Sequence, residues 1–343
     1  MKEPSMQDVA EKSGFHRTTV SRALKDNPRI PAATRFQIQR IAEEMGYRPN
    51  PLVSALMTQR SGKKGASAER PVIAYLSWED EVTYKTFHVP RGFREGARQC
   101  ANKMGYHLEI FRLFDGKMSA RRLGGVLNAR GIRAVCVGPL PHERSRLHLP
   151  WDGFAAVGIG YTLLHPQLNR VVIHHYHNSF TAMRMLRKAG YRRVGLFLDK
   201  SLSNRSDDGW LGGFLVARER HPSHDYPLLL SEKKLQSYET FARWFERNQP
   251  DALLVEDTAV ESYLSRMGLS VPGDVGLATL DWNPKFSHWS GMDQKADAVG
   301  AAAIEVIDGN LRRNEFGKPQ VYKNIMIEGR WVNGNTLREM GDG

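Results

Sequence analysis

Residues 5–24 read SMQDVAEKSGFHRTTVSRAL, and this stretch decides how the N-terminal end of the chain folds. Ser5 followed three positions later by Asp8 is typical of a capping box, in which two side chains satisfy free amides at a helix start. Gly14 supplies the left-handed residue that commonly ends a helix. The sequence therefore predicts a short first helix whose apolar face consists of Met6, Val9 and Ala10.

A second short helix is expected almost without a loop after the first, because helical spacing resumes just beyond Gly14. One side of it is apolar, and the other is polar and basic, with Arg17 and Arg22. A third helix is expected at residues 34–45, before Gly46. The apolar residues of these two helices are Val20, Ala23, Leu24, Ile38, Ile41, Ala42 and Met45. Three short helices with a basic middle one are typical of helix-turn-helix DNA binding.

Basic residues are concentrated in the N-terminal part of the chain. The 343 residues include 49 Lys and Arg against 37 Asp and Glu, a formal net charge of +12, and 41% are hydrophobic, too many for a disordered chain. Residues 1–70 contain 13 basic and 7 acidic side chains, residues 71–150 again contain 13 and 7, and the remaining 193 contain 23 of each. The excess therefore indicates that the first 150 residues face a polyanion.

Neither a disulfide framework nor an export or membrane segment is expected. The two cysteines, Cys100 and Cys136, lie far apart in apolar surroundings, which favours a reducing compartment. Acidic residues interrupt the N-terminus, and no apolar run is long enough to cross a bilayer. We therefore expect a soluble, cytoplasmic, nucleoid-associated protein without a membrane partner.

Five motifs within residues 5–60 closely resemble the headpiece of the lac-repressor (LacI/GalR) family of transcription regulators. They are MQDVA at 6–10, Gly14, TVSR at 19–22, TR at 34–35 and GYRPN at 46–50. In that family the second helix enters the major groove, and the resemblance implies base contacts from Arg17, Thr18 and Arg22. An arginine that contacts guanine O6 and N7 together discriminates bases by about 1–3 kcal/mol. Phosphate contacts are expected from Ser5, Thr19, Ser21, Thr34 and Asn50.

Two positions depart from the pattern of that family. His16 stands where a serine usually caps the recognition helix, and a histidine is expected to cap less well. Pro31 stands where another serine caps the third helix, and proline is compatible with a first-turn position. The helix-turn-helix motif remains recognisable despite these two departures. The phosphate contacts that the two serines would make are not expected of His16 and Pro31.

Residues 50–57 resemble the family's hinge helix, which forms when two subunits occupy the operator and inserts a leucine from each into the minor groove. The matching residues are Leu56 as the wedge, Val53 facing the partner helix, and Ser54. The alternative is that Leu56 is an ordinary core leucine. So short a segment is unstable as an isolated helix, so we expect it to become ordered on DNA. Residues 61–70, rich in Gly, Ser and Lys, are typical of a linker.

From residue 71 onward, short β-branched runs alternate with amphipathic helical stretches that end in glycine. The expected strands are 72–76, 107–112, 134–137, 155–159, 194–198, 252–255 and 276–280, and the expected helices are 92–103, 119–129, 182–189, 209–220 and 258–267. This βαβ repetition predicts parallel sheets covered by helices, hence an α/β body. The length favours two lobes with a cleft between them. We expect one lobe at about 71–165 and 288–322, and the other at about 166–287 and 323–343.

Acids and aromatic rings follow several of the expected strands, where ligands of open parallel sheets bind. As a set they suit a sugar-like ligand, although each alone is as readily a helix cap or a packing group. GYRRV at 190–194, Gly213-Phe214, Asp281 and Gln294 also resemble the family's effector domain, a fold like periplasmic sugar-binding proteins. The resemblance implies effector contacts from Asp281 and Gln294. The full candidate set is Ser77, Trp78, Tyr161, Trp210, Asp257, Asp281, Trp282 and Gln294.

The match departs from the family where a sugar would be held. Trp210 replaces the arginine that usually grips sugar hydroxyls, and a flat apolar ring cannot replace a guanidinium. His174, His175 and His177 raise the alternative of a metal site. Strand alternation would put only His175 and His177 on one face, and no third ligand is evident, so neither a metal nor a cofactor is expected.

Together these features predict a small all-α headpiece at 1–48, a hinge helix at 49–60, a linker at 61–70 and a two-lobed domain at 71–343. We expect a homodimeric repressor of carbohydrate-related genes that binds a palindromic double-stranded DNA operator. A small-molecule effector, of carbohydrate type, would occupy the cleft.

The alternative is a DNA-binding head fused to a sugar-modifying α/β enzyme that uses Asp257 or Asp281 as its base. The sequence contains no paired catalytic constellation, so an enzyme is not expected. A transport-type binding protein shares the body fold but would need an export signal and no headpiece. Arg121-Arg122 and Arg144-Ser145-Arg146 are expected to be solvated, and to face DNA phosphate only at long range.

Overall fold

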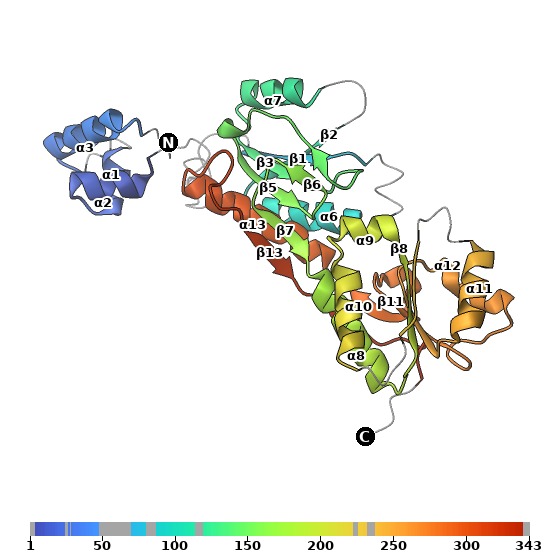
Figure 1. The fold of residues 1–343 in the computed structure, drawn as a ribbon. Coiled ribbons are helices and arrows are strands. Elements are labelled where there is room, and N and C mark those ends of the chain that lie inside the picture. Colours follow the sequence, from blue (N-terminus) through green and yellow to red (C-terminus); the bar gives the residue numbers. More distant parts are fainter. Residues whose placement is uncertain are drawn as a thin grey trace.

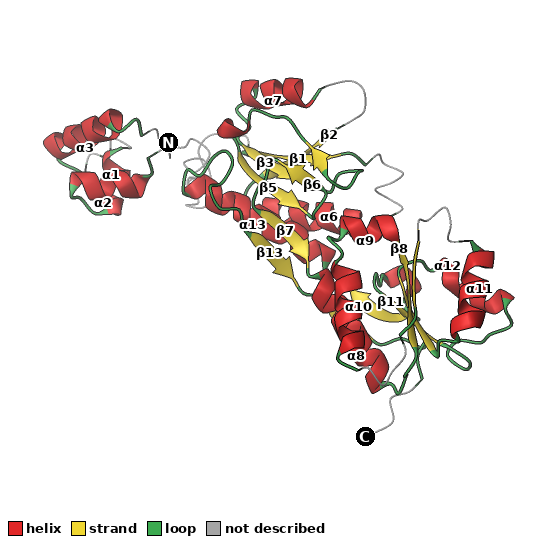
Figure 2. Ribbon diagram, in the orientation of Figure 1, coloured by secondary structure: helices red, strands yellow, loops and turns green. Residues whose placement is uncertain are grey.

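The structure is a computed structural model, and it describes residues 4–24, 27, 29–47, 70–79, 87–113, 119–221, 226–231 and 237–338. Three short helices form the N-terminal headpiece, and two α/β lobes follow, each built on a sheet (Figures 1 and 2). The expected fold class is therefore confirmed. Asn50 and the expected hinge residues Val53, Ser54 and Leu56 lie outside the described residues.

The headpiece consists of α1 (Met6–Ser13), α2 (Arg17–Ala23) and α3 (Ala32–Glu44). The expected capping box starts α1, because the amide and the hydroxyl of Ser5 donate to the Asp8 carboxylate at 2.6 and 2.7 Å. Gly14 ends the helix in the left-handed region, at φ 71°. Local sequence signals thus fix both ends of the first helix.

The third helix starts earlier than expected. It begins at Ala32 rather than at Thr34, and Pro31 is its N-cap rather than a first-turn residue. Pro31 combines its ring-restricted φ of −53° with an extended ψ of 141°, which suits a cap but not a helical turn. The three helices enclose one small core of Val9, Ala10, Val20, Ala23, Ile30, Ile38, Ala42 and Tyr47.

The first lobe contains a six-stranded parallel sheet in the order β13-β7-β5-β3-β1-β2. Its strands are β1 (Val72–Ser77), β2 (His107–Arg112), β3 (Ala134–Val137), β5 (Ala155–Ile159), β7 (Arg170–Ile173) and β13 (Asn324–Ile327). Helices α6 (His88–Lys103) and α13 (Ala296–Arg312) cover one face, and α7 (Ala120–Ala129) covers the other. The short strands β4 (Ser145–Arg146) and β6 (Leu163–His165) pair beside this sheet.

Helices α6 and α13 pack closely because each carries a glycine at the contact. A Cβ on Gly96 would overlap the carbonyl of Asp297, and a Cβ on Gly300 would overlap the carbonyl of Phe93. Both helices present small or aliphatic side chains to the sheet. The covered face of the first lobe thus depends on two positions that tolerate no side chain.

The second lobe contains a sheet in the order β14-β12-β11-β10-β8-β9. Its strands are β8 (Val194–Asp199), β9 (Leu228–Ser231), β10 (Ala252–Val255), β11 (Gly276–Thr279), β12 (Ser290–Asp293) and β14 (Arg330–Val332), and only β14 runs antiparallel to its neighbour among the paired strands described. Helices α8 (His175–Lys188) and α10 (Gly209–Glu219) cover one face, and α11 (Tyr238–Asn248) and α12 (Ala259–Arg266) cover the other. The short helix α9 (Lys200–Arg205) follows β8 directly.

The described chain passes between the lobes three times, and the three crossings contact one another. They follow Ile173, Asp293 and Ile327 in turn. The amide of His174 in the first crossing donates to the carbonyl of Ile327 in the third, at 2.8 Å. In the third crossing, a Cβ on Gly329 would lie 2.7 Å from the carbonyl of Asp293. The lobes are thus joined by three adjacent strand ends.

These crossings differ from the lobe boundaries expected from the sequence. The first lies after Ile173 rather than near residue 165, because β7 pairs with both β5 and β13 in the first sheet. The loop between β5 and β7 carries β6 and no helix, so the βαβ pattern gives no sign of the neighbouring strand. Residues 290–293 belong to the second sheet, because β12 pairs with β11, and residues 324–327 belong to the first.

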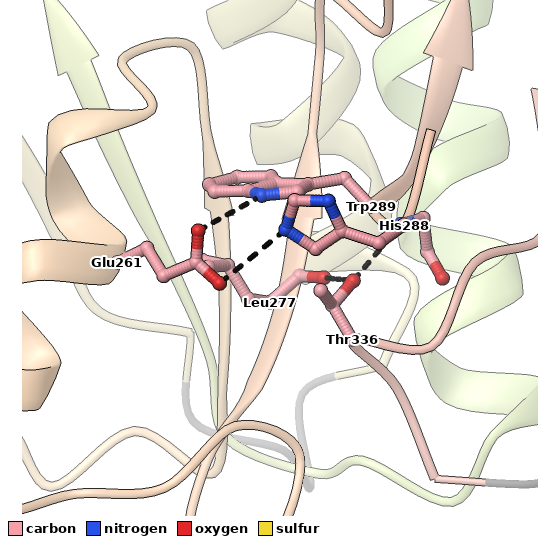
Figure 3. Close-up of polar contacts among 6 residues, drawn as sticks. Glu261, Leu277, His288, Trp289 and Thr336 are labelled. Carbon is pink, nitrogen blue, oxygen red and sulfur yellow. Dashed lines mark hydrogen bonds and ion pairs between the residues drawn. The ribbon is translucent and has the colours of Figure 1, made fainter. Parts of the chain in front are cut away.

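A polar network fixes the outer edge of the second lobe (Figure 3). The Thr336 hydroxyl accepts from the Ser290 amide at 2.9 Å and donates to the Leu277 carbonyl at 2.6 Å. The Glu261 carboxylate accepts from Trp289 Nε1 at 3.1 Å, and it lies 3.6 Å from His288 Nε2. The segment after β14 is thereby held on β11 and β12. No helix among the residues with described structure is long and apolar enough to span a membrane.

Candidate nucleic-acid interface and effector cleft

The exposed side of α2 carries the three residues expected to contact bases. Arg17, Thr18 and Arg22 are exposed, whereas Val20 and Ala23 are fully buried in the headpiece core. Helical periodicity places the exposed three on one side of α2 and the buried two on the other. The helix is therefore held by its apolar side and presents two guanidinium groups and a hydroxyl to the solvent.

His16 caps α2, although the family usually has a serine there. Its Nδ1 accepts from the Thr18 amide at 3.4 Å, and it lies 2.8 Å from Thr18 Oγ1. The recognition helix thus keeps a side-chain cap. The same contact orients the hydroxyl of Thr18, which is one of the residues expected to contact bases. The histidine at position 16 therefore affects that expected contact.

The residues expected to contact phosphate differ in their hydrogen bonds and in their exposure. The Ser5 hydroxyl both donates to Asp8 and accepts from its amide, so the capping box competes with any phosphate contact. Thr19, Ser21 and Thr34 are half-buried at the headpiece surface. Their phosphate contacts stay predictions, as do those of the hinge.

At the cleft edge of the first sheet, β1 ends in a buried polar pair. The Ser77 hydroxyl donates to the Glu79 carboxylate, and the Glu79 amide donates to Ser77 Oγ at 3.3 Å. Burial raises the pKa of the Glu79 carboxyl, which is 5% exposed, while the bond from Ser77 and the charges of Arg94 and Arg205 lower it. Trp78 between them is half-buried. Glu79 is therefore a buried acid at the end of β1, close to Arg205 of the second lobe, that the candidate set omitted.

In the second lobe, the structure brings Asp281 and Gln294 into contact. Burial raises the pKa of Asp281 to about 7, a hydrogen bond with the Gln294 side chain lowers it, and the charge of Asp293 raises it. Asp281 Oδ1, Gln294 Oε1 and Trp282 Nε1 are buried polar atoms with no hydrogen-bond partner among the residues described. Two of the eight candidate effector residues, Asp281 and Gln294, thus meet at one place, and each has a polar atom without a partner among the described residues.

Trp210 and Asp257 both have contacts within the second lobe. Trp210 is 6% exposed in the core of the second lobe, and its ring packs edge-on against His175 with centroids 4.7 Å apart. The Asp257 carboxylate accepts from the Ala259 amide at 2.9 Å, at the start of α12. Trp210 Nε1 is nevertheless a buried donor with no partner among the described residues. The effector contacts of both residues stay predictions.

The three histidines begin a helix, so the expectation of a strand there is wrong. His174 is the N-cap of α8, and its Nδ1 accepts from the His177 amide at 3.3 Å. Burial lowers the pKa of His175 to about 3, so its ring is neutral. Within the described part of the chain, no group of three or more His, Cys, Asp or Glu side chains is arranged to hold a metal.

A pocket of about 280 Å³ lies between the end of β5 and the starts of α8 and α10. Tyr161 lines it together with His174, His175, Asp207 and Asp208. Burial and the charge of Asp207 raise the pKa of Tyr161. This pocket adjoins the first crossing between the lobes, so Tyr161 sits where the lobes meet.

Helix α9 of the second lobe forms hydrogen bonds to the loop at residues 140–143 of the first lobe. The Arg205 guanidinium donates to the carbonyls of Leu140 and Pro141 at 2.8 and 2.7 Å, and the Asn204 amide donates to the Glu143 carboxylate at 3.1 Å. Burial lowers the pKa of Arg205, and the charges of Glu143 and Glu79 raise it. We call this set of contacts the α9 clasp. Nothing in the local sequence around Arg205 signals a partner more than 60 positions away.

Comparison with known protein families assigns both parts of the chain. Residues 5–50 match "Bacterial regulatory proteins, lacI family", and residues 183–336 match "Periplasmic binding protein-like domain". The chain is 23% identical over 337 residues to the HTH-type transcriptional regulator PtxS of Pseudomonas putida, with 95% of each protein covered. It is 24% identical over 291 residues to the regulator AscG of Escherichia coli K12, covering 81% of this chain and 82% of AscG.

Two further similarities concern regulators whose structures are known. The chain is 26% identical over 200 residues to CelR of Thermobifida fusca, a match that spans 54% of CelR and 56% of this chain. The structure of a CelR–cellobiose complex superimposes with a TM-score of 0.60 at 18% identity, covering 97% of this chain and 99% of that one. A lac repressor dimer bound to operator and an anti-inducer gives 0.59 at 17%, covering 98% and 100%. At such identities these structures establish the shared fold alone.

Proposed function

We propose that this chain, a DNA-binding transcription regulator of the LacI family, binds a near-palindromic operator as a homodimer and represses carbohydrate-related genes. The observation that carries the proposal is the exposed basic side of α2 on a capped three-helix headpiece, joined in one chain to a two-lobed domain. The lac repressor, whose fold is similar, is known as a dimer bound to operator. A two-fold operator matches a two-fold protein, because each headpiece then reads one half-site.

Base reading is assigned to Arg17, Thr18 and Arg22, and minor-groove bending to the hinge residues Val53, Ser54 and Leu56. Selection from random DNA by the full chain tests this assignment. We expect an enriched palindrome, and we expect Arg17→Ala and Arg22→Ala each to relax one position of both half-sites, at about 1–3 kcal/mol per lost bidentate contact.

Arg40→Ala is the matched control for this selection. Arg40 is an exposed arginine of α3 that pairs with Glu44 at 3.4 Å, so its loss removes the same charge from a different face of the headpiece. The control variant should select the wild-type palindrome. Failure of the wild-type protein to enrich any palindrome would overturn the operator proposal.

We infer that the effector is an uncharged, hydroxyl-rich molecule held near Asp281 and Gln294. Their unpaired oxygens can accept from hydroxyl groups, and the Trp282 indole can donate. The raised pKa values of Asp281 and Glu79 favour a neutral ligand, because neither acid is a strongly stabilised carboxylate that would demand a cation. A thermal-shift screen of neutral saccharides, repeated with Gln294→Ala, tests the site. A ligand that stabilises both proteins equally would place it elsewhere.

Effector and operator are proposed to be coupled through the lobes. An effector that prefers one arrangement of the lobes must change operator affinity, and operator must change effector affinity by the same factor. Calorimetry of a screened saccharide with and without operator measures that factor. Equal affinities in both titrations would contradict the coupling.

We propose binding without turnover. Of the two acids considered as a base for an enzyme, Asp257 accepts from a backbone amide at the start of α12, and Asp281 is hydrogen-bonded to the Gln294 side chain. Chemical conversion of the bound saccharide, followed by chromatography, would contradict this proposal.

A further inference from the structure

A wide groove crosses the first lobe, away from the effector cleft. Its volume is about 1140 Å³, and its walls come from α7, from the segment after β4, from the end of β6 and from the loop before β13. Five of its lining residues are basic or histidine, and we call it the basic groove. They are Arg121, Arg146, His148, His165 and Lys318.

The basic groove lies at the edge of the sheet where the headpiece is attached. Its segments at 146–151, 165–167 and 318–319 directly precede β5, β7 and β13, so they lie at the N-terminal ends of these parallel strands. β1 is parallel to them and begins at Val72, just after the linker. The tether of the headpiece therefore enters the lobe at the edge that carries the groove, whereas the effector residues follow the opposite strand ends.

The charge of the groove is of one sign. All five basic and histidine residues are exposed, and no Asp or Glu belongs to the lining that the described residues form. Asp152 is close by, but it packs against Gly317 outside the lining. Pockets for small ligands measure roughly 300–1,000 Å³ and are mostly apolar. The groove lies just above this size range, and three exposed cations, Arg121, Arg146 and Lys318, stand along it, which suits a polyanion.

The wall that carries Arg146 and His148 is firmly held. Leu147, Leu149 and Trp151 alternate with the exposed residues and are buried at 2, 8 and 6% exposure. Trp151 Nε1 donates to the Leu147 carbonyl at 3.2 Å. This alternation fixes the segment from inside, so the side chains of Arg146 and His148 project from a rigid support.

We propose that the basic groove binds the phosphate backbone of the DNA duplex beside the operator. The proposal rests on the proposed function, because the headpiece must first place DNA next to the lobe. Once an operator is bound, the flanking duplex is confined near the groove. The effective concentration of its phosphates at the groove is then high, so even weak contacts add to the affinity. A single strand carries one charge for roughly every 3.4 Å of duplex axis, which offers several phosphates along the groove.

The test compares two duplexes that carry the same selected palindrome. One ends at the palindrome, and the other extends it by about two helical turns, roughly 20 base pairs, on each side. Fluorescence anisotropy with the full chain gives the affinity for each between about 50 and 200 mM salt. The variant combines Arg121→Ala, Arg146→Ala and Lys318→Ala. The control removes the same charge from exposed arginines of the second lobe, by Arg184→Ala, Arg218→Ala and Arg247→Ala.

Wild type and control should prefer the longer duplex, with a steeper salt dependence. Loss of three phosphate contacts lowers the slope of log affinity against log salt by roughly 2.7, which over a fourfold salt range is roughly a 40-fold change. The groove variant should lose this advantage and bind the short duplex like wild type.

Four results would overturn the proposal. Equal affinity of wild type for both duplexes overturns the groove assignment alone, and so does an equal loss in groove and control variants. A groove variant that keeps its preference for length but loses calorimetric binding of inorganic phosphate would make the groove a small-anion site instead. Absence of binding to the short duplex would overturn the proposed function as well.

Discussion

Replacing Arg205 by alanine should loosen the lobes without unfolding either one. The guanidinium forms two charge-assisted hydrogen bonds from α9 to carbonyls of the first lobe, at 2.8 and 2.7 Å. A bond to a charged group contributes about 1.5–3 kcal/mol when buried, and partial exposure of Arg205 reduces the pair to about 2 kcal/mol in total. Helix α9 spans only Lys200–Arg205; the Asp199 carboxylate caps its start, and the Arg205 contact holds its end, because so short a helix is unstable alone. A loss of about 2 kcal/mol corresponds to roughly 30-fold less protection against local opening.

Hydrogen exchange of the full chain measures this directly. Backbone amides of α9 and of the loop after β3 should exchange roughly 30-fold faster in Arg205→Ala, whereas amides in the two sheets keep their rates. Lys200→Ala is the matched control, because Lys200 is an exposed cation of the same helix. If α9 amides exchange at the wild-type rate in Arg205→Ala, the clasp does not hold the lobes and the reasoning fails.

Four further changes test separate contacts. Thr336→Val leaves two buried backbone groups unpaired and should lower the free energy of unfolding by about 2–4 kcal/mol in urea titrations; an unchanged midpoint would contradict the network of Figure 3. Gly300→Ala should cost about 1–3 kcal/mol by overlap with the facing helix, whereas Gly125→Ala, which meets open space on α7, should not destabilise. His16→Ala should cost about 1 kcal/mol by removing the cap of α2, and His16→Ser should restore it, as read by headpiece melting. The pKa of Asp281 is about 7 in the folded chain against 3.8 ordinarily, so between these pH values the folded state keeps a proton that the unfolded state releases. The protonated carboxyl therefore contributes fully to the free energy of unfolding below about pH 4, and this contribution is lost as the pH rises to about 7. Asp281→Asn should remove this pH dependence of the free energy of unfolding in titrations between about pH 4 and 7.

Features encoded by neighbouring residues could be predicted from the sequence. The capping box of Ser5 and Asp8 and the left-handed Gly14 act within one helical turn, so residue types and spacing define them. The strand at 252–255 begins and ends where its apolar run does, because a parallel strand that is buried on both faces must be apolar along its whole length.

Features that depend on tertiary packing could not be predicted. The first lobe extends to Ile173 because β7 finds partners on both sides, and no local signal marks that pairing. The polar run at 174–177 has no apolar stripe, so its helical start depends on the cap made by His174. Trp210 follows a charged turn and yet is buried, because α10 packs against α8. Burial of Glu79 likewise depends on arginines from other elements.

The three crossings between the lobes have a consequence for synthesis of the protein. The first sheet cannot be completed until β13, which ends at Ile327, has left the ribosome, and the second sheet needs β14 after it. The headpiece core, by contrast, closes within residues 9–47 and can form as soon as they emerge. A nascent or prematurely terminated chain would thus carry a folded headpiece before either α/β lobe is complete. If the proposed function holds, such a chain could reach DNA before it can respond to an effector.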